Sequence, residues 1–270
     1  MINVTPDGIM ASVRKIREMS PLIHNITNYV VMNTTANALL ALGASPVMAH
    51  AKEEVRDMVS IARALVINLG TLSQPWVESA FMAAEEATAR NVPVVIDPVG
   101  AGATPYRTKV FRDMILAFPP TVIRGNASEI MALSMESATT KGVDSTDPSH
   151  QAIEGASRLN KELGSVVCVS GEIDYVVHGA DVATIRNGHP MMPRVTGLGC
   201  TASALCGAFA AVQPDAPRAV AEAMAVMGIA GEMAAEDAPG PGTLQVRFID
   251  ALHRLEYSHI TKLLKVGGKS

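Results

Sequence analysis

Short apolar runs alternate along the chain with longer segments in which apolar residues recur every three or four positions. The run Val94–Asp97 is the clearest strand, because its residues are β-branched until the last. The apolar runs predict strands at 22–25, 45–48, 65–67, 94–97, 122–123 and 166–169. The amphipathic segments predict a first helix opening at Thr5-Pro6-Asp7, and others at 30–42, 53–64, 74–91, 107–117, 128–134, 152–163, 201–212 and 216–235. This β-α order predicts a mostly parallel sheet covered by helices on both faces.

The pattern changes in the last third of the chain. The runs 175–178 and 182–185 flank Gly179-Ala180-Asp181, which is typical of a hairpin. After this hairpin the pattern is helical, and Leu244, Phe248, Leu252 and Leu255 share one face of a last helix. We therefore expect an α/β fold with an antiparallel edge to its sheet, and residues 1–270 forming a single domain.

Composition narrows the class of protein. With 48% hydrophobic and 18% charged residues, the chain can bury a large core, which excludes disorder as its main state. The net charge of −4, without a basic block, disfavours nucleic-acid binding, as does the aromatic content of 4%. The three cysteines form no CxxC pair, so neither a disulfide framework nor a zinc site is indicated. No signal peptide or membrane span is apparent, and we expect a cytoplasmic protein.

Candidate chemistry lies where strands end, because ligands of such sheets bind beyond the carboxyl ends of the strands. Gly197-Leu198-Gly199-Cys200 precedes a predicted helix, and its backbone N–H groups and the positive helix end suit an anion such as a phosphate. A tight loop without a ligand is the alternative for the glycines. Cys200 lies where a helix N-terminus can lower the pKa of a thiol, unless it is simply a small buried hydrophobic residue.

Two carboxylates follow apolar strands. Asp97 and Glu129 can face one crevice, and two carboxylates completed by phosphate oxygens and water suit Mg²⁺. Each has a structural alternative. Asn126 and Glu129 have the spacing of a capping box, and Asp97 precedes Pro98 in what can be a turn.

Three further residues at strand ends are compatible with binding. Arg124 can clamp a phosphate or form a surface ion pair. Ser170 can bond a phosphate or stabilise the turn at Gly171, and Met48 can contact a substrate or fill the core. Taken together, the strand ends favour phosphoryl transfer.

Five segments in order along the chain resemble the hydroxyethylthiazole kinases of the ribokinase-like superfamily. The resemblance extends from about Ile9 to beyond Phe248, and it is carried by PLIHNITN at 21–28, ASPVM at 44–48, VIDPVG at 95–100, RGNASE at 124–129 and VTGLGC at 195–200. It implies a ribokinase-like fold and the ATP- and Mg²⁺-dependent phosphorylation of 4-methyl-5-(2-hydroxyethyl)thiazole. It also implies a homotrimer whose active sites are shared between neighbouring subunits.

The resemblance also assigns roles to residues. It implies an anion hole and catalytic turn formed by Gly197, Leu198, Gly199 and Cys200, ATP contacts from Arg124, Ser170 and Asn126, Mg²⁺-phosphate contacts from Asp97 and Glu129, and a thiazole pocket with Asn25, Met48, Gly70 and Gly197. Related kinases usually have an aspartate base where this chain has Cys200. The alternatives are another vitamin or hydroxymethylpyrimidine kinase, a thiazole- or nucleotide-binding regulator, and an ATP-dependent repair enzyme acting on a hydrated nicotinamide.

Overall fold

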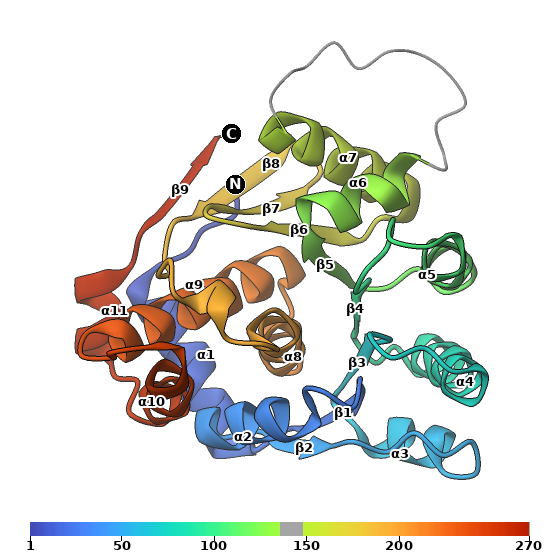
Figure 1. The fold of residues 1–270 in the computed structure, drawn as a ribbon, viewed down its shortest axis with the longest axis horizontal. Helices are drawn as coiled ribbons and strands as arrows, with labels where there is room; N and C mark the ends of the chain where they lie inside the picture. Colours follow the sequence, from blue (N-terminus) through green and yellow to red (C-terminus); the bar gives the residue numbers. More distant parts are fainter. Residues whose placement is uncertain (136–147, 270) are drawn as a thin grey trace.

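One nine-stranded sheet runs through the protein, here described by a computed structural model that covers residues 1–135 and 148–269 (Figure 1). The order is β2-β1-β3-β4-β5-β6-β7-β8-β9; the first six strands are parallel and the last three antiparallel. The strands are β1 Leu22–Ile26, β2 Ser45–Val47, β3 Ala64–Asn68, β4 Val94–Asp97, β5 Val122–Asn126, β6 Val166–Ser170, β7 Asp174–His178, β8 Asp181–Ile185 and β9 Val266–Lys269. A mostly parallel sheet with an antiparallel edge was expected, and it is confirmed.

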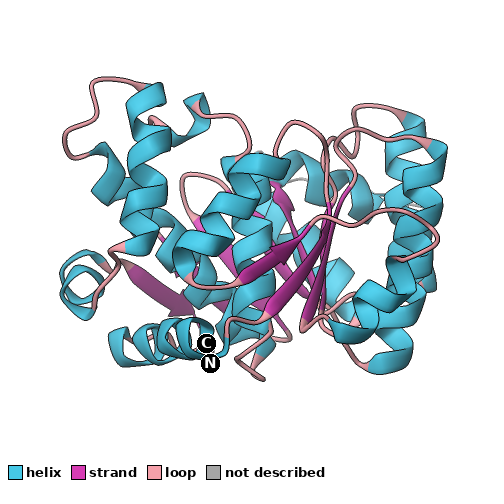
Figure 2. Cartoon of the chain, turned by 90° about the horizontal axis from the view of Figure 1, so that it is seen from below, coloured by secondary structure: helices cyan, strands magenta, loops and turns pink. Residues whose placement is uncertain are grey.

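Helices cover both faces of this sheet (Figures 1 and 2). Those on one face are α1 Pro6–Met19, α2 Met32–Leu42, α8 Leu198–Ala210, α9 Ala216–Ala235, α10 Pro241–His253 and α11 Tyr257–Leu263. Those on the other are α3 Val55–Ile61, α4 Gln74–Arg90, α5 Pro105–Ala117, α6 Ala127–Met135 and α7 Pro148–Leu163. A short 3-10 helix, Met192–Arg194, precedes α8.

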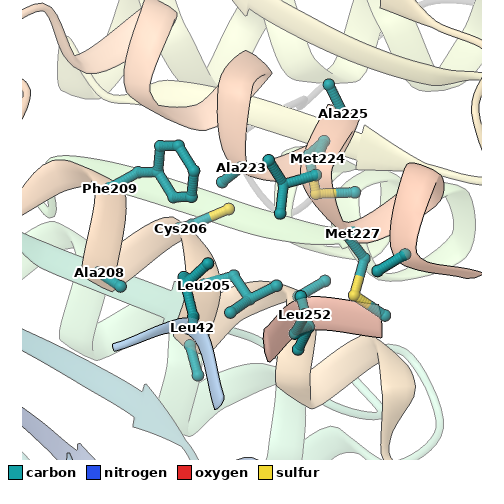
Figure 3. Close-up of a cluster of buried hydrophobic side chains, with 14 of the residues drawn as sticks. Leu42, Leu205, Cys206, Ala208, Phe209, Ala223, Met224, Ala225, Met227 and Leu252 are labelled. Atoms are coloured by element: carbon teal, nitrogen blue, oxygen red, sulfur yellow. The ribbon is translucent and has the colours of Figure 1, made fainter. Parts of the chain in front are cut away.

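Two hydrophobic cores result, because successive side chains of a strand point to opposite faces. Val66 and Val95 pack toward α8 and α9, whereas Ile67 and Ile96 pack toward α4 and α5. In the first core, apolar side chains of α8, α9 and α10 interlock, among them Leu205, Phe209, Met224, Met227 and Leu252 (Figure 3). Burial on both faces explains why the parallel strands are almost wholly apolar until their final residues.

Local chemistry fixes several boundaries. Helix α1 begins where the Thr5 hydroxyl accepts a hydrogen bond from the N–H of Gly8 at 3.1 Å, with Pro6 in the first turn. Helix α9 spans the predicted residues 216–235. The predicted helix 53–64 is shorter at both ends, since α3 is Val55–Ile61, and Ala64 already belongs to β3.

The C-terminal segment was predicted incompletely. Its last helix ends at His253 rather than including Leu255, and α11 and β9 were not predicted. Strand β9 contains Gly267 and Gly268, which have low strand propensity, and it exists because it pairs with the open edge of β8. Among the described residues, no helix combines the length and apolar character that a membrane crossing requires.

Candidate active site

The carboxyl ends of the parallel strands bring predicted site residues together. Asn68 and Asp97 end β3 and β4 and are paired in register. Asn126 and Ser170 end β5 and β6 and are likewise paired. Because neighbouring parallel strands end at the same edge, residues far apart in sequence form one polar rim.

Helix α8 begins at this rim. Gly197 is its N-cap, with φ of +83°, and a Cβ there would lie 2.8 Å from the Val31 side chain, so glycine is required. The helix begins at Leu198, three residues earlier than predicted, so Gly199 and Cys200 lie in its first turn rather than in a preceding loop. Their N–H groups lack acceptors within the helix, as at every helix N-terminus, and this end favours an anion.

Arg124 links this helix end to β6. Its side chain is buried, and Nη1 donates to the Gly199 carbonyl at 3.0 Å while Nη2 donates to Ser170 Oγ at 2.7 Å. Its Nε has no hydrogen-bond partner among the described residues. Asp97 and Asp174 attract the guanidinium and raise its pKa despite its burial. Arg124 is therefore a buried cation held by neutral acceptors, which is not the surface ion pair considered as its alternative.

A large cavity opens beside Arg124. It has a volume of about 1030 Å³, and its lining includes Arg124, Ser170, Gly197 and Gly199. Further lining residues come from β7, from the segment 186–195 and from α9. Asn126 does not line it: its Oδ1 accepts from the N–H of Glu129 at 3.0 Å and from Ser128 Oγ at 2.7 Å.

Asp97 is buried at the centre of the rim. Its Oδ2 accepts hydrogen bonds from Asn68 Nδ2 at 2.8 Å and from Ser203 Oγ at 2.9 Å. Burial raises the pKa of Asp97 to about 6, with a further increase from Glu129 and an opposing effect from Arg124. The side chain bonds to β3 and α8, which is not what a simple turn residue before Pro98 would do.

Glu129 has the structural role considered for it. Its Oε2 accepts from the N–H of Asn126 at 2.8 Å, and Asn126 Oδ1 accepts from the Glu129 N–H, which completes a capping box. Its Oε1 accepts from the N–H of Gly100 at 2.9 Å. The carboxylate thus also ties the loop after β4 to the start of α6.

Asp97 and Glu129 suit a metal ion whose remaining ligands come from a bound phosphate and from water. No group of three or more His, Cys, Asp or Glu side chains within 1–135 and 148–269 is placed to hold a metal. Oδ2 accepts both of these hydrogen bonds to Asp97, so neither of them occupies Oδ1. Mg²⁺ commonly uses one or two carboxylates together with phosphate oxygens and water, and Asp97 with Glu129 suits this arrangement.

Cys200 does not have the lowered pKa that its helix position suggested. Burial, with a contribution from Asp97, raises the pKa of its thiol to about 11. Sγ lies 3.8 Å from Asn28 Nδ2, which is a weak hydrogen bond. Desolvation and the Asp97 carboxylate outweigh the opposing effects of Asn68, Arg124 and Asn28 on this pKa, so the thiol is protonated at neutral pH.

The four residues assigned to a thiazole pocket come from separate elements. Asn25, within β1, is buried and donates from Nδ2 to the Ile23 carbonyl at 2.9 Å, while its Oδ1 has no partner among the described residues. Gly70 follows β3 and lies against Asn28, whose Nδ2 would be 2.8 Å from an added Cβ. Met48 follows β2 and is half-buried, and Gly197 packs on Val31. Neither Asn25, Met48 nor Gly70 lines the large cavity.

Sequence reasoning did not single out four residues that connect these parts. Asn28, Asn68 and Ser203 form hydrogen bonds around Asp97 and Cys200. Arg107 donates to the carbonyls of Leu69, Val99 and Gly70, and so joins the loops after β3 and β4. Asn68 had a signal, since it is a polar residue that ends an apolar strand as Asp97 does. Ser203 and Arg107 lie within helices and had none.

Comparison with known proteins identifies the family to which this chain belongs. The family model described as "Hydroxyethylthiazole kinase family" matches residues 13–258. A hydroxyethylthiazole kinase of Syntrophus aciditrophicus is 59% identical over 98% of both chains, and one of Vibrio atlanticus is 52% identical over 96% of this chain and 98% of its own.

Solved structures agree with the sequence comparison. The structure of a hydroxyethylthiazole kinase protein from Pyrococcus horikoshii has a TM-score of 0.91 and 43% identity, covering 98% of this chain and 100% of its own. A pyridoxal kinase of Staphylococcus aureus shares only the fold, with a TM-score of 0.64 and 18% identity over 92% of this chain and 97% of its own. The predicted ribokinase-like fold is confirmed, and the chain belongs to the hydroxyethylthiazole kinase family.

Proposed function

We propose that the protein transfers the γ-phosphoryl group of ATP to the hydroxyl of 4-methyl-5-(2-hydroxyethyl)thiazole, in thiamine salvage. The observation that carries the proposal is the first turn of α8, which lines the large cavity at Gly199 and contacts, through Cys200 Sγ, the Asn28 amide on which Gly70 packs. Its N–H groups suit the charge on a phosphoryl group in transfer. We further propose that residues 1–270 act as a single kinase domain.

The large cavity is the proposed nucleotide site. A volume of about 1030 Å³ accommodates a nucleoside triphosphate, and Arg124 and Ser170 lie at its inner end beside α8. The Nε of Arg124, which has no partner in the described part of the chain, supports a further bond to a phosphate oxygen. Asn126 contributes through the capping of α6, because its side chain is already bonded there.

Asp97 and Glu129 are the proposed anchors of Mg²⁺, which when bound neutralises charge on the phosphates. The structural support is that burial and mutual repulsion raise the pKa of Asp97 to about 6, and a nearby cation would relieve both effects. Glu129 keeps its backbone bonds to Gly100 and Asn126, so any contribution comes from a carboxylate already fixed in place.

Catalysis by these residues rests mainly on positioning. Phosphoryl transfer passes through a loose transition state, so early removal of the alcohol proton is not required. Cys200, whose thiol pKa is about 11, is a poor general base at neutral pH and instead shapes the site beside Asn28. The N–H groups of Gly199 and Cys200, in the first turn after the Gly197 cap, stabilise developing charge.

The thiazole alcohol, which receives the phosphoryl group, is proposed to bind on the side of Asn25, Met48, Gly70 and Gly197. Gly70 and Gly197 allow a close approach to the backbone, and Asn25 Oδ1, without a partner within 1–135 and 148–269, can accept a hydrogen bond. Tyr29 and Val30, beside this region, are 67% and 61% exposed, which supports coverage by a second subunit. We propose a cytoplasmic homotrimer whose sites lie at subunit interfaces.

A substrate panel tests the proposal. Purified protein receives Mg-ATP with hydroxyethylthiazole, hydroxymethylpyrimidine, pyridoxal or ribose, and mass spectrometry detects phosphorylated products. We expect a phosphate on the thiazole alcohol alone. If only another alcohol of the panel is phosphorylated, that alcohol is the substrate instead of the thiazole. If ATP binds and no alcohol is phosphorylated, the regulator alternative is favoured. Native mass spectrometry of the same sample tests the trimer.

A further inference from the structure

We infer that Asn68 is a positioning residue. It holds three groups in one fixed geometry: the Asp97 carboxylate, the Asn28 amide beside Cys200, and the loop at Gly70 on the proposed thiazole side. This inference rests on the proposed function. Asn68 is buried at the carboxyl end of β3, where none of the predicted catalytic or binding roles was placed. Its three hydrogen bonds lead to three different parts of the site.

The two ends of the Asn68 side chain have different partners. Nδ2 donates to Asp97 Oδ2 at 2.8 Å. Oδ1 accepts from Asn28 Nδ2 at 2.8 Å and from the Gly70 N–H at 3.2 Å. An ionised carboxylate only accepts and a backbone N–H only donates, so the orientation of the amide is fixed by its chemistry. Turning it over would place oxygen against the Asp97 carboxylate and nitrogen against the Gly70 N–H.

The network continues from Asn28 to the thiol. Asn28 Oδ1 accepts from the N–H of Val30 at 3.1 Å, which fixes the orientation of this amide too. Its Nδ2 therefore faces both Asn68 Oδ1 and Cys200 Sγ. Gly70 packs directly on this amide, because an added Cβ would lie 2.8 Å from Nδ2. Displacing Asn68 thus releases Asn28 and, with it, one side of the Cys200 environment.

Asn68 itself has no hydrogen bond to Arg124 or Ser170 within the described part of the chain. Arg124 bonds to Ser170 and Gly199, and Asn68 does not line the large cavity. Ser203 supplies a second donor to Asp97, so the carboxylate keeps one bond when Asn68 is lost. The loss should therefore lower kcat while leaving the KM for ATP nearly unchanged, because alignment rather than nucleotide binding is impaired.

Two variants separate the two ends of the amide. Asn68→Ala removes all three bonds. Asn68→Asp keeps an oxygen that accepts from Asn28 and Gly70 but turns a like charge toward Asp97. Asn160→Ala is the matched control, since Asn160 is a buried asparagine that bonds to the Ser165 carbonyl and the Gly179 N–H, far from the strand ends of the site.

Two readouts are measured on each protein. Steady-state kinetics gives kcat and the KM for ATP. Alkylation by iodoacetamide, followed at Cys200 by peptide mass spectrometry, reports the thiol environment without requiring any kinase activity. Cys168 and Cys206 are fully buried and serve as internal references.

We expect Asn68→Ala to lower kcat by about 30-fold or more, to change the KM for ATP by less than about threefold, and to slow Cys200 alkylation by about fivefold, because the amides of Asn68 and Asn28 lower the pKa of this thiol. Asn68→Asp should lower kcat comparably and also slow alkylation, because it replaces a donor with a negative charge near the thiol, and Asn160→Ala should change neither readout beyond about twofold. Unchanged kcat and alkylation in Asn68→Ala would overturn the inference. If Asn68→Ala does not fold, full kcat in the near-isosteric Asn68→Asp would overturn it. If the wild-type protein phosphorylates no thiazole, the proposed function fails, whereas the alkylation rates still decide the role of Asn68.

Discussion

Replacing Asp97 with asparagine should stabilise the folded protein while reducing its activity. The cause is the cost of holding an ionised carboxylate at a position that is only 2% exposed. The pKa of Asp97 is about 6 in the folded protein, and an unperturbed aspartate has a pKa of about 3.9. That difference corresponds to about 3 kcal/mol of lost stability at neutral pH. It already includes the favourable effects of Arg124, Asn68 and Ser203.

The sign follows from proton binding. An acid whose pKa is higher in the folded state binds protons more tightly there, so its penalty is fully present above about pH 6 and fades as the pH falls toward 4. Asparagine resembles the neutral acid in shape and carries no charge. We therefore expect Asp97→Asn to raise the free energy of unfolding by up to about 3 kcal/mol at pH 7.5, by about half as much at pH 5, and by little at pH 4.

Urea denaturation in EDTA, at one protein concentration, measures this effect. Trp76 is the single tryptophan and is buried in α4, so its fluorescence reports unfolding. Asp57→Asn, which changes an exposed aspartate in the first turn of α3, is the control and should have a much smaller effect. A loss of stability at pH 7.5, or a gain that is equal at all three pH values, would refute the reasoning. Activity of Asp97→Asn should fall by at least about 100-fold, because a carboxylate that supports the phosphate region is lost.

Three further variants test separate parts of the structure. Arg124→Ala should raise the KM for ATP at least about tenfold by removing a charged donor from the cavity, as ATP titrations would show. Cys200→Ser should keep turnover within about tenfold of wild type and leave its pH profile unchanged, because a thiol with a pKa of about 11 is no base at pH 7; abolished turnover in a folded, ATP-binding variant would contradict this. Gly207→Ala should lower the unfolding free energy by about 1–3 kcal/mol in urea, because its Cβ would lie 2.6 Å from Val66 Cγ2, and an unchanged midpoint would contradict the packing argument.

The order of elements was readable from the sequence because burial on two faces leaves a distinctive pattern. A strand such as β4 is apolar until Asp97, and helix α9 follows its predicted bounds. Strand ends in an α/β sheet collect polar residues, so Asp97, Arg124 and Ser170 were recognisable as candidates before any contact was known. The five short segments that resemble hydroxyethylthiazole kinases identified the family that the comparisons confirm.

The tertiary structure decided what those candidates do, because the deciding contacts join residues distant in sequence. The pKa of Cys200, in α8, is raised by burial and by Asp97 of β4, and its place at a helix start reveals neither. Glu129 is at once a capping residue and a neighbour of Asp97, two roles that the sequence left as alternatives. Strand β9 forms only because β8 presents an open edge. Asn68 shows the same limit: its bonds to Asn28 and Asp97 exist only once β1, β3 and β4 lie side by side. Sequence periodicity reports which face of an element is buried, whereas the electrostatics of a site depend on which faces meet.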